Sequence, residues 1–403
     1  MRPLVAALAL AVFPAASAAS PQDLFAYGGR ASAMGGTGAT FLDDYAAVHG
    51  NPAGLSRARE RGLTLGFAAT AFDLTTDGRH FPADVGSATV IGLTLPVPFG
   101  GILRDRVGVG FGFFTPTNVI VRGRILRPET PQFVLLPDRV QSVAVQLAVG
   151  VDLGYGLRVG GGVAALAGLT GSVVVAADAT GRASSRIDDQ LVASYAPVLG
   201  ASLDAGPFRF AVVVRGTLTG RFLVTIEARD LGITIPTLNI SGVAQYDPAQ
   251  VHAEAAWVAH GWTLALAGTY KRWSDYPGPV EATTPGSPAP PDPGFSDTVV
   301  LRAGAERRWD FPDHTAIAAR GGYLYEPSPA PAPGNGRNYL DNDRHALTAG
   351  ASLSALALGT RYTMDVYTQV HLLAPRTASA GMGTPGSFGG TVLVAGVTTS
   401  VTF

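Results

Sequence analysis

The feature that most constrains this sequence is a regular alternation of apolar residues with small or polar ones. Between Ser142 and Leu153, every second residue from Val143 onward is apolar, and the residues between them are small or polar. The same alternation runs through 262–272 and 357–372. Because successive side chains of a β-strand point to opposite faces, this period of two predicts strands with one apolar face. The segments run for about ten to sixteen residues, against about five or six in soluble sheets, so they can cross a membrane when tilted.

The composition excludes several other classes of protein. Hydrophobic residues make up 47% of the chain and charged residues only 15%, below the roughly 25% charged residues of a soluble domain. Beyond the N-terminus, no apolar run is long enough to span a bilayer as a helix. The net charge of −1 gives no basic footprint for nucleic acid. The absence of cysteine rules out a disulfide scaffold, a thiolate zinc site and a cysteine nucleophile.

We therefore expect an all-β fold, a transmembrane antiparallel β-barrel of about fourteen strands, an even number as bacterial barrels require. Short connections alternate with long ones, as periplasmic turns alternate with outer loops. Aromatic residues at strand ends, such as Trp262 and Trp309, suit an interfacial girdle. The connection 223–245 also holds residues that suit strand extensions. The expected strands are 62–75, 87–98, 105–115, 140–153, 156–170, 190–204, 208–222, 246–260, 262–273, 297–309, 313–325, 343–355, 357–371 and 389–403.

The chain divides into three expected parts. Residues 1–19 have the positive start, apolar core and small-residue cleavage site of a secretory signal peptide, which indicates export to the bacterial outer membrane. Residues 20–61 do not alternate, so they suit either a plug inside the lumen or a periplasmic tail. Residues 62–403 suit the barrel. The last strand alternates up to Phe403, which resembles the signal that outer-membrane barrels present to the barrel-assembly machinery.

Two motifs resemble a known family. Residues 28–37 and 44–55, with Asn51, Pro52 and Ala53 at their centre, resemble the N-terminal hatch of FadL-type outer-membrane transporters. The stretch 320–344 resembles a conserved stretch near the C-terminus of the same family. The resemblance implies a barrel plugged by a hatch that takes up long-chain fatty acids or, in relatives, aromatic hydrocarbons.

A strand expected at 105–115 carries three glycines on its lumen face, Gly108, Gly110 and Gly112. Successive glycines weaken a strand and favour a bend or a bulge. One interpretation is a kink that opens a lateral gate for hydrophobic cargo, which the resemblance also implies for the third strand. The other is that the glycines make room for the hatch to pack.

The connection 116–139 suggests where a ligand first lands. It holds or adjoins four apolar residues in a loop expected to be polar, so they need a partner. They either capture a hydrophobic ligand or pack the loop onto the barrel mouth. If the ligand is a carboxylate, Lys271 and Arg139 are candidate counter-charges. The four apolar residues are Phe114, Phe133, Leu135 and Leu136.

The inward positions of the expected strands also carry charges, which a lumen can hydrate or pair. We expect a salt-bridged network there that holds the hatch. Its members are Arg302, Glu306, Arg320, Arg361 and Asp365.

No enzyme signature accompanies these features. The histidines lack metal-ligand spacing and no nucleophile elbow occurs, so we expect no catalytic residue, metal or cofactor. The expected function is passive uptake of a hydrophobic small molecule by an outer-membrane monomer whose other partners are membrane lipids and the assembly machinery. The alternatives are a general or plugged porin for small solutes and a barrel with a mainly structural role.

Overall fold

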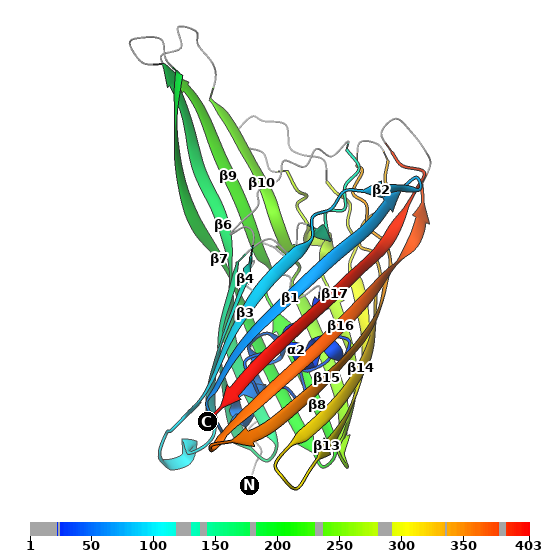
Figure 1. The fold of residues 1–403 in the computed structure, drawn as a ribbon. Helices are drawn as coiled ribbons and strands as arrows, with labels where there is room; N and C mark the ends of the chain where they lie inside the picture. Colours follow the sequence, from blue (N-terminus) through cyan, green and yellow to red (C-terminus); the bar gives the residue numbers. More distant parts are fainter. Residues whose placement is uncertain are drawn as a thin grey trace, which may run out of the picture.

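The computed structural model describes residue 22 and residues 25–117, 130–137, 143–177, 183–229, 237–280, 292–334, 337–378 and 384–403. Most of these residues lie in long antiparallel strands that wind around one axis (Figure 1). The strands of the wall are β1 (Gly62–Thr76), β3 (Gly86–Val97), β4 (Val107–Pro116), β5 (Ala144–Gly154), β6 (Leu157–Ala177), β7 (Ala183–Ala205), β8 (Phe208–Arg215), β11 (Gln250–Ala259), β12 (Trp262–Lys271), β13 (Thr298–Asp310), β14 (Ala316–Glu326), β15 (Arg344–Ala357), β16 (Thr360–Thr377) and β17 (Ser387–Thr402).

The wall closes into a ring because its first and last strands pair. β1 and β17 are antiparallel, with Gly62 opposite Thr402 and Thr76 opposite Phe388. Each remaining strand of the ring pairs with the next one, so the barrel has fourteen strands. The prediction of a closed fourteen-stranded antiparallel barrel is confirmed.

Part of the wall continues beyond the rim as a tall extension. β9 (Leu218–Arg229) follows β8 after Gly216 and Thr217, pairs in parallel with β6, and pairs antiparallel with β10 (Leu238–Asp247). These strands rise with β6 and β7 above the neighbouring strands (Figure 1). The described residues of the connection 223–245 thus lie mainly in strands, and β6 and β7 are longer than expected from sequence. The short strand β2 (Arg79–Phe81) pairs with the outer end of β1.

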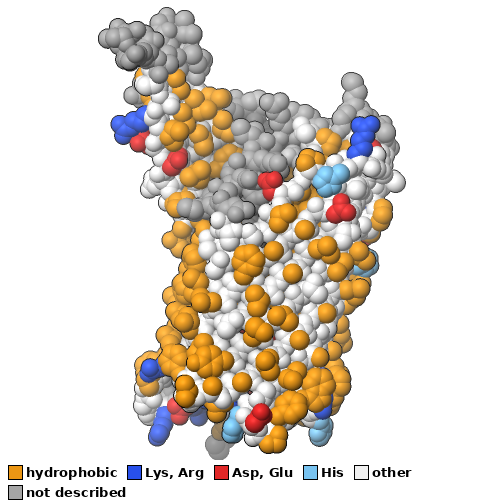
Figure 2. Space-filling model, viewed as in Figure 1, with side chains coloured by type: hydrophobic (Ala, Val, Ile, Leu, Met, Phe, Trp, Pro, Cys, Tyr) orange, Lys and Arg blue, Asp and Glu red, His pale blue; other side chains and the backbone are white. Residues whose placement is uncertain are grey.

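The outer surface of the barrel is apolar between two charged ends (Figure 2). Leu65, Leu147 and Leu266 are among its exposed side chains, as the alternation requires. At one end, Trp262 and Trp309 both lie close to Arg307, with ring centroids 5.4 and 5.6 Å from its guanidinium carbon. This arrangement is typical of an interfacial girdle.

The described residues include no helix that is both long and apolar enough to cross a membrane. The helical elements are short. They are α2 (Gly29–Ala33), α3 (Ala47–Gly50), η1 (Pro52–Arg57), η2 (Gly101–Leu103) and η4 (Trp273–Asp275).

The N-terminal segment fills the lumen as a hatch, which we define as residues 25–58. α2 packs on β14 to β17, whereas α3 and η1 pack on β4 to β7. Its side chains Met34, Tyr45 and Leu55 are almost wholly buried. Of the two sequence interpretations for this segment, the plug is therefore the one that the structure has.

Candidate functional site

The motif residues Asn51, Pro52 and Ala53 start η1 and attach it to the wall. The Asn51 side chain accepts a hydrogen bond from the Ala53 N–H at 3.0 Å, which caps the helix. Its amide nitrogen donates to the carbonyls of Ala39, at 2.8 Å, and of Ala201 in β7, at 3.2 Å. Pro52 suits the first helical position because its missing N–H would have no partner there. The motif therefore acts as both a cap and an anchor.

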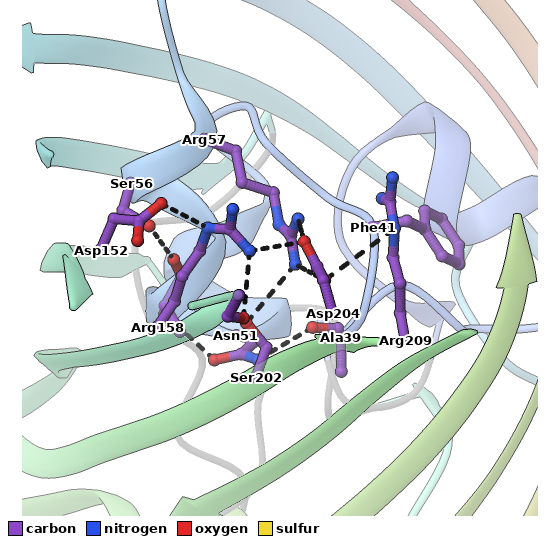
Figure 3. A network of polar contacts seen from close by, with 12 residues as sticks. Ala39, Phe41, Asn51, Ser56, Arg57, Asp152, Arg158, Ser202, Asp204 and Arg209 are labelled. Carbon is purple, nitrogen blue, oxygen red and sulfur yellow. Dashed lines mark hydrogen bonds and ion pairs between the residues drawn. The ribbon is translucent and has the colours of Figure 1, made fainter. Parts of the chain in front are cut away.

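An ion-pair cluster holds the other end of η1 (Figure 3). Arg57 makes two hydrogen bonds with Asp204 in β7, at 2.6 and 2.8 Å. Arg158 in β6 donates to the same carboxylate at 2.6 Å, and its Nε lies 3.1 Å from Asp152 Oδ2. Arg209 Nε lies 4.0 Å from Asp204 Oδ1. Paired guanidinium–carboxylate contacts fix orientation as well as distance, so η1 is fixed against β6 and β7.

A second cluster holds α2 against the opposite wall. Arg30 donates to both oxygens of Glu306 in β13, at 3.0 and 2.6 Å. Arg320 in β14 bridges Glu306, at 2.6 Å, and Asp365 in β16, at 2.5 Å. Three of the five charges expected in a lumen network thus meet, and Arg30 from the hatch joins them. Arg30 could be found only once the hatch was known to face this wall.

Of the other two expected network residues, Arg302 lies apart from this cluster and Arg361 lies beside it. Arg302 donates to Thr269 Oγ1 at 2.6 Å and lines a polar pocket on the outer side of the hatch. Arg361 lines a charged vestibule on the side where the short turns lie, together with Glu306 and Asp365. The alternation of inward and outward residues predicts that these side chains face the lumen. It does not give their position along the barrel axis.

Glu254 in β11 is a contact that the sequence argument missed. It is buried and accepts hydrogen bonds from the N–H groups of Gly38 and Thr40, at 2.8 and 2.9 Å. The Thr40 hydroxyl donates to it at 2.6 Å, and His252 Nε2 lies 3.5 Å away. A lone carboxylate on the inward face of an apolar strand was the available signal, because such a group needs partners.

The three glycines of β4 accommodate the hatch. A Cβ atom at Gly108 would lie 2.0 Å from the Leu55 carbonyl oxygen, and one at Gly110 would lie 2.6 Å from a Leu55 methyl carbon. At Gly112 it would lie 2.5 Å from the Tyr27 hydroxyl. The expected kink is absent, because β4 pairs with β3 and β5 without a register shift. The hatch packs directly on this strand and leaves no need for a bulge.

The described apolar residues of the long connection are covered by protein, as the second of the two interpretations, packing onto the barrel mouth, requires. Phe133, Leu135 and Leu136 are 2 to 5% exposed. The Phe133 ring packs edge-to-face against Phe81, with centroids 5.2 Å apart. Phe114 lies in β4 and lines a pocket inside the lumen. These residues find their partners in the barrel mouth and the lumen.

Lys271, expected as a counter-charge for a ligand carboxylate, already has one. Its side chain is fully buried, and its Nζ donates to Glu326 at 2.6 Å. Arg344 hydrogen-bonds the other oxygen of Glu326. Lys271 thus shares the Glu326 carboxylate with Arg344, and its role as a counter-charge for a ligand stays a prediction. Arg139 and the signal peptide lie outside the described residues.

An apolar pocket lies between the hatch and β1, β3, β4 and β17. Its aromatic lining suits a small hydrophobic molecule. No cluster of three or more potential metal ligands occurs among the described residues. The main side chains of the pocket are Phe25, Tyr27, Tyr45, Val90, Phe114 and Val394.

No family model matches the chain, and no curated protein matches its sequence. Solved structures do resemble it. A Pseudomonas aeruginosa FadL homologue aligns with a TM-score of 0.59 at 13% identity, over 96% of this chain and 98% of that one. The P. putida toluene transporter TodX aligns at 0.55 and 14%, over 94% and 98%. The CymD monoaromatic hydrocarbon channel aligns at 0.53 and 15%, over 93% and 97%.

Proposed function

We propose that this chain, which has the fold of the FadL-type transporters, is an outer-membrane channel for passive uptake of hydrophobic molecules. The observation that carries the proposal is the apolar pocket beside the hatch. An open porin would need a continuous aqueous lumen. The buried hatch counts against that alternative and against a barrel with only a structural role.

The route out is the second part of the proposal. A hydrophobic molecule loses about 0.8 kcal/mol for each CH₂ group that it exposes to water. The vestibule below the hatch contains charged side chains such as Arg308 and Arg361, so passage through it is unfavourable. We therefore propose lateral exit through the wall at β4, which requires the hatch to withdraw from Gly108, Gly110 and Gly112 and the pairing of β4 with β3 or β5 to open.

The cargo class follows from the charges. Long-chain fatty acids are the cargo that the sequence resemblance implies, and toluene is what TodX transports according to its description. The buried Lys271 already hydrogen-bonds Glu326, which a ligand carboxylate would have to displace, so this contact supports cargo that enters without a negative charge. A hydrocarbon or the protonated form of a fatty acid meets this condition.

Uptake by cells tests the proposal. A Gram-negative host without its own hydrophobe channels should take up labelled p-xylene and labelled oleate faster when it makes this protein. Equal uptake by cells with and without the protein would contradict the proposal, provided that heat-modifiable migration on gels shows that the barrel is folded.

The lateral route has its own test, Gly110→Leu. The leucine side chain blocks part of the glycine face of β4 that the cargo must pass. Uptake should therefore fall while the barrel still assembles. Gly268→Leu in β12 is the matched control, since a Cβ there meets nothing within 4 Å. The variant could instead displace the hatch without blocking the route. Cells would then admit a large hydrophilic antibiotic, and uptake of the hydrophobic cargo would not fall. Those two results together would exclude exit at β4.

A further inference from the structure

The turn between β3 and β4 is the longest of the short connections and carries exposed apolar side chains. It spans 98–106 and includes η2, whereas two residues join β11 to β12. In Figure 1 it is the cyan turn that projects from the lower left of the barrel. Phe99, Ile102 and Leu103 are 48, 87 and 40% exposed. Apolar side chains that are grouped and exposed in this way need a partner.

This turn lies beside the turn between β5 and β6. The Asp152 N–H donates to the Arg106 carbonyl at 2.8 Å. A Cβ atom at Gly154 would lie 3.7 Å from a terminal nitrogen of Arg106, so the guanidinium reaches across to the second turn. The exposed apolar residues of the two turns form what we call the turn patch. They are Phe99, Ile102, Leu103, Leu153 and Tyr155.

Membrane lipid is the partner that the position of the turn patch favours. The patch continues the apolar outer surface of the wall, where Leu95 in β3 and Leu157 in β6 are also exposed. A soluble partner would have to cover the patch while the side chains directly beside it face the membrane. Lipid covers both without a boundary between them.

The charges of the turn indicate which lipid. The charged residues of 98–106 are Arg104, Asp105 and Arg106, which leave an excess of one positive charge. The Arg104 Nε lies 3.8 Å from Asp105 Oδ2, and both side chains are exposed, so this ion pair is weak. Figure 2 shows basic side chains beside apolar ones at this corner of the molecule. Arginines next to inserted apolar residues attract phosphate groups that carry a net negative charge.

We propose that the turn patch inserts into the inner leaflet of the outer membrane, and that Arg104 and Arg106 bind the phosphate of an anionic phospholipid. The bound lipid holds the start of β4 at the level of the headgroups. This contact goes beyond the proposed function, because uptake of a hydrophobic cargo does not require it.

The test uses the absence of cysteine from the chain. Ile102→Cys is labelled with the fluorophore NBD, and the full-length protein is reconstituted into vesicles. The vesicles contain a small fraction of either phosphatidylglycerol or phosphatidylcholine with a nitroxide quencher on the acyl chain. Both lipids should quench the label, and phosphatidylglycerol should do so about fivefold more strongly, as expected for one net positive charge near a lipid surface. With Arg104→Gln and Arg106→Gln added, the two lipids should quench equally.

Asp313→Cys is the matched control, since Asp313 is exposed on the turn between β13 and β14 at the same end of the barrel. Its label should stay in water and be quenched by neither lipid. Heat-modifiable migration shows that each variant is folded.

Three results would overturn the inference. A label at position 102 that neither lipid quenches would exclude insertion. Equal quenching by the two lipids before the arginines are replaced would exclude a preference for anionic lipid. A preference that persists without the arginines would exclude their role in it. Uptake of p-xylene by cells with the wild-type protein tests the proposed function separately, so either can fail without the other.

Discussion

The hatch is held differently on its two sides. On one side, α2 is attached to β13–β16 by directed polar contacts, among them the two hydrogen bonds of Arg30 to Glu306. On the other side, Arg57 and Asn51 anchor η1 to β7, but towards β4, β5 and β6 the hatch meets glycines with backbone and apolar atoms. There, Cβ atoms at Gly150 and Gly160 would lie only 2.4 Å from atoms of the hatch backbone.

The difference shows how a plug can be both fixed and removable. Ion pairs with two hydrogen bonds resist displacement in every direction, because leaving them exposes uncompensated charge. Packing on glycine depends on shape and gives no such resistance once the surfaces separate. We therefore expect the contact of the hatch with β4 to open more readily than the attachment of α2, while Asn51 and Arg57 keep η1 on β7.

The largest expected effect comes from filling the glycine side. In Gly108→Val, the new side chain occupies the space of the Leu55 carbonyl, which should destabilise the seated η1 by about 3 kcal/mol. Hydrogen exchange should accelerate in residues 47–57 and stay slow in α2. Gly268→Val, at an open position, should change the exchange rate in neither segment. Equal acceleration in both segments would show that the two sides are not independent.

Removing one charge should release the other side. Glu306→Gln leaves Arg30 and Arg320 without their shared carboxylate, and we expect a loss of about 2 kcal/mol in the seating of α2. Exchange should now accelerate in α2 and less in η1. The double variant Arg30→Gln/Glu306→Gln should be less perturbed than Glu306→Gln alone. A double variant that is worse would mean that charge balance is not what holds α2.

A smaller effect is expected where α2 ends. The Thr348 hydroxyl donates to the Ala33 carbonyl at 2.8 Å and accepts from the Gly35 N–H at 2.9 Å. Thr348→Val keeps the shape and removes both bonds, which should cost about 1 kcal/mol. Exchange of the Gly35 amide reports the loss. If the Gly35 amide is as protected from exchange as in wild type, packing alone holds this turn in place.

The last expected effect is a pH dependence. Burial, together with the neighbouring carboxylate of Asp43, raises the pKa of Asp44 to about 7. The seated hatch therefore holds a proton that a solvated aspartate releases near pH 4. Its seating should weaken as pH rises from about 4 through about 7 and then stay constant. Asp44→Asn should flatten this profile, which exchange at pH 5.5 and 8 can follow after correction for intrinsic rates. An unchanged slope would assign the pH effect to another group.

The sequence was sufficient for the barrel because alternation reports directly on the wall. Each inward or outward position follows from parity alone, as Glu306 and Leu147 illustrate. The hatch has no such period, and its placement depends on contacts between distant segments. Gln369, for example, donates to the carbonyls of Phe25 and Ser32 at 2.9 Å, a pairing that no local pattern contains.

The contacts that the sequence does not show at the site have related causes. Lys271 was correctly placed inside the wall, but the sequence does not show that Glu326 lies 2.6 Å from it. Phe133 was correctly seen to need a partner, and that partner is the protein itself. Parity gives the face on which a residue lies and leaves its neighbours on that face undetermined.

The ring closure described above has a consequence for the order of folding. Closing a loop in an unfolded chain costs about 0.6 kcal/mol more for each doubling of its length. Arg57 and Asp204 are 147 residues apart, and Arg30 and Glu306 are 276 apart, nearly one doubling. The seam between β1 and β17 joins the most distant strands of all. Contacts at high sequence separation form slowly, so η1 should dock early in refolding, and α2 should lock only as the seam closes.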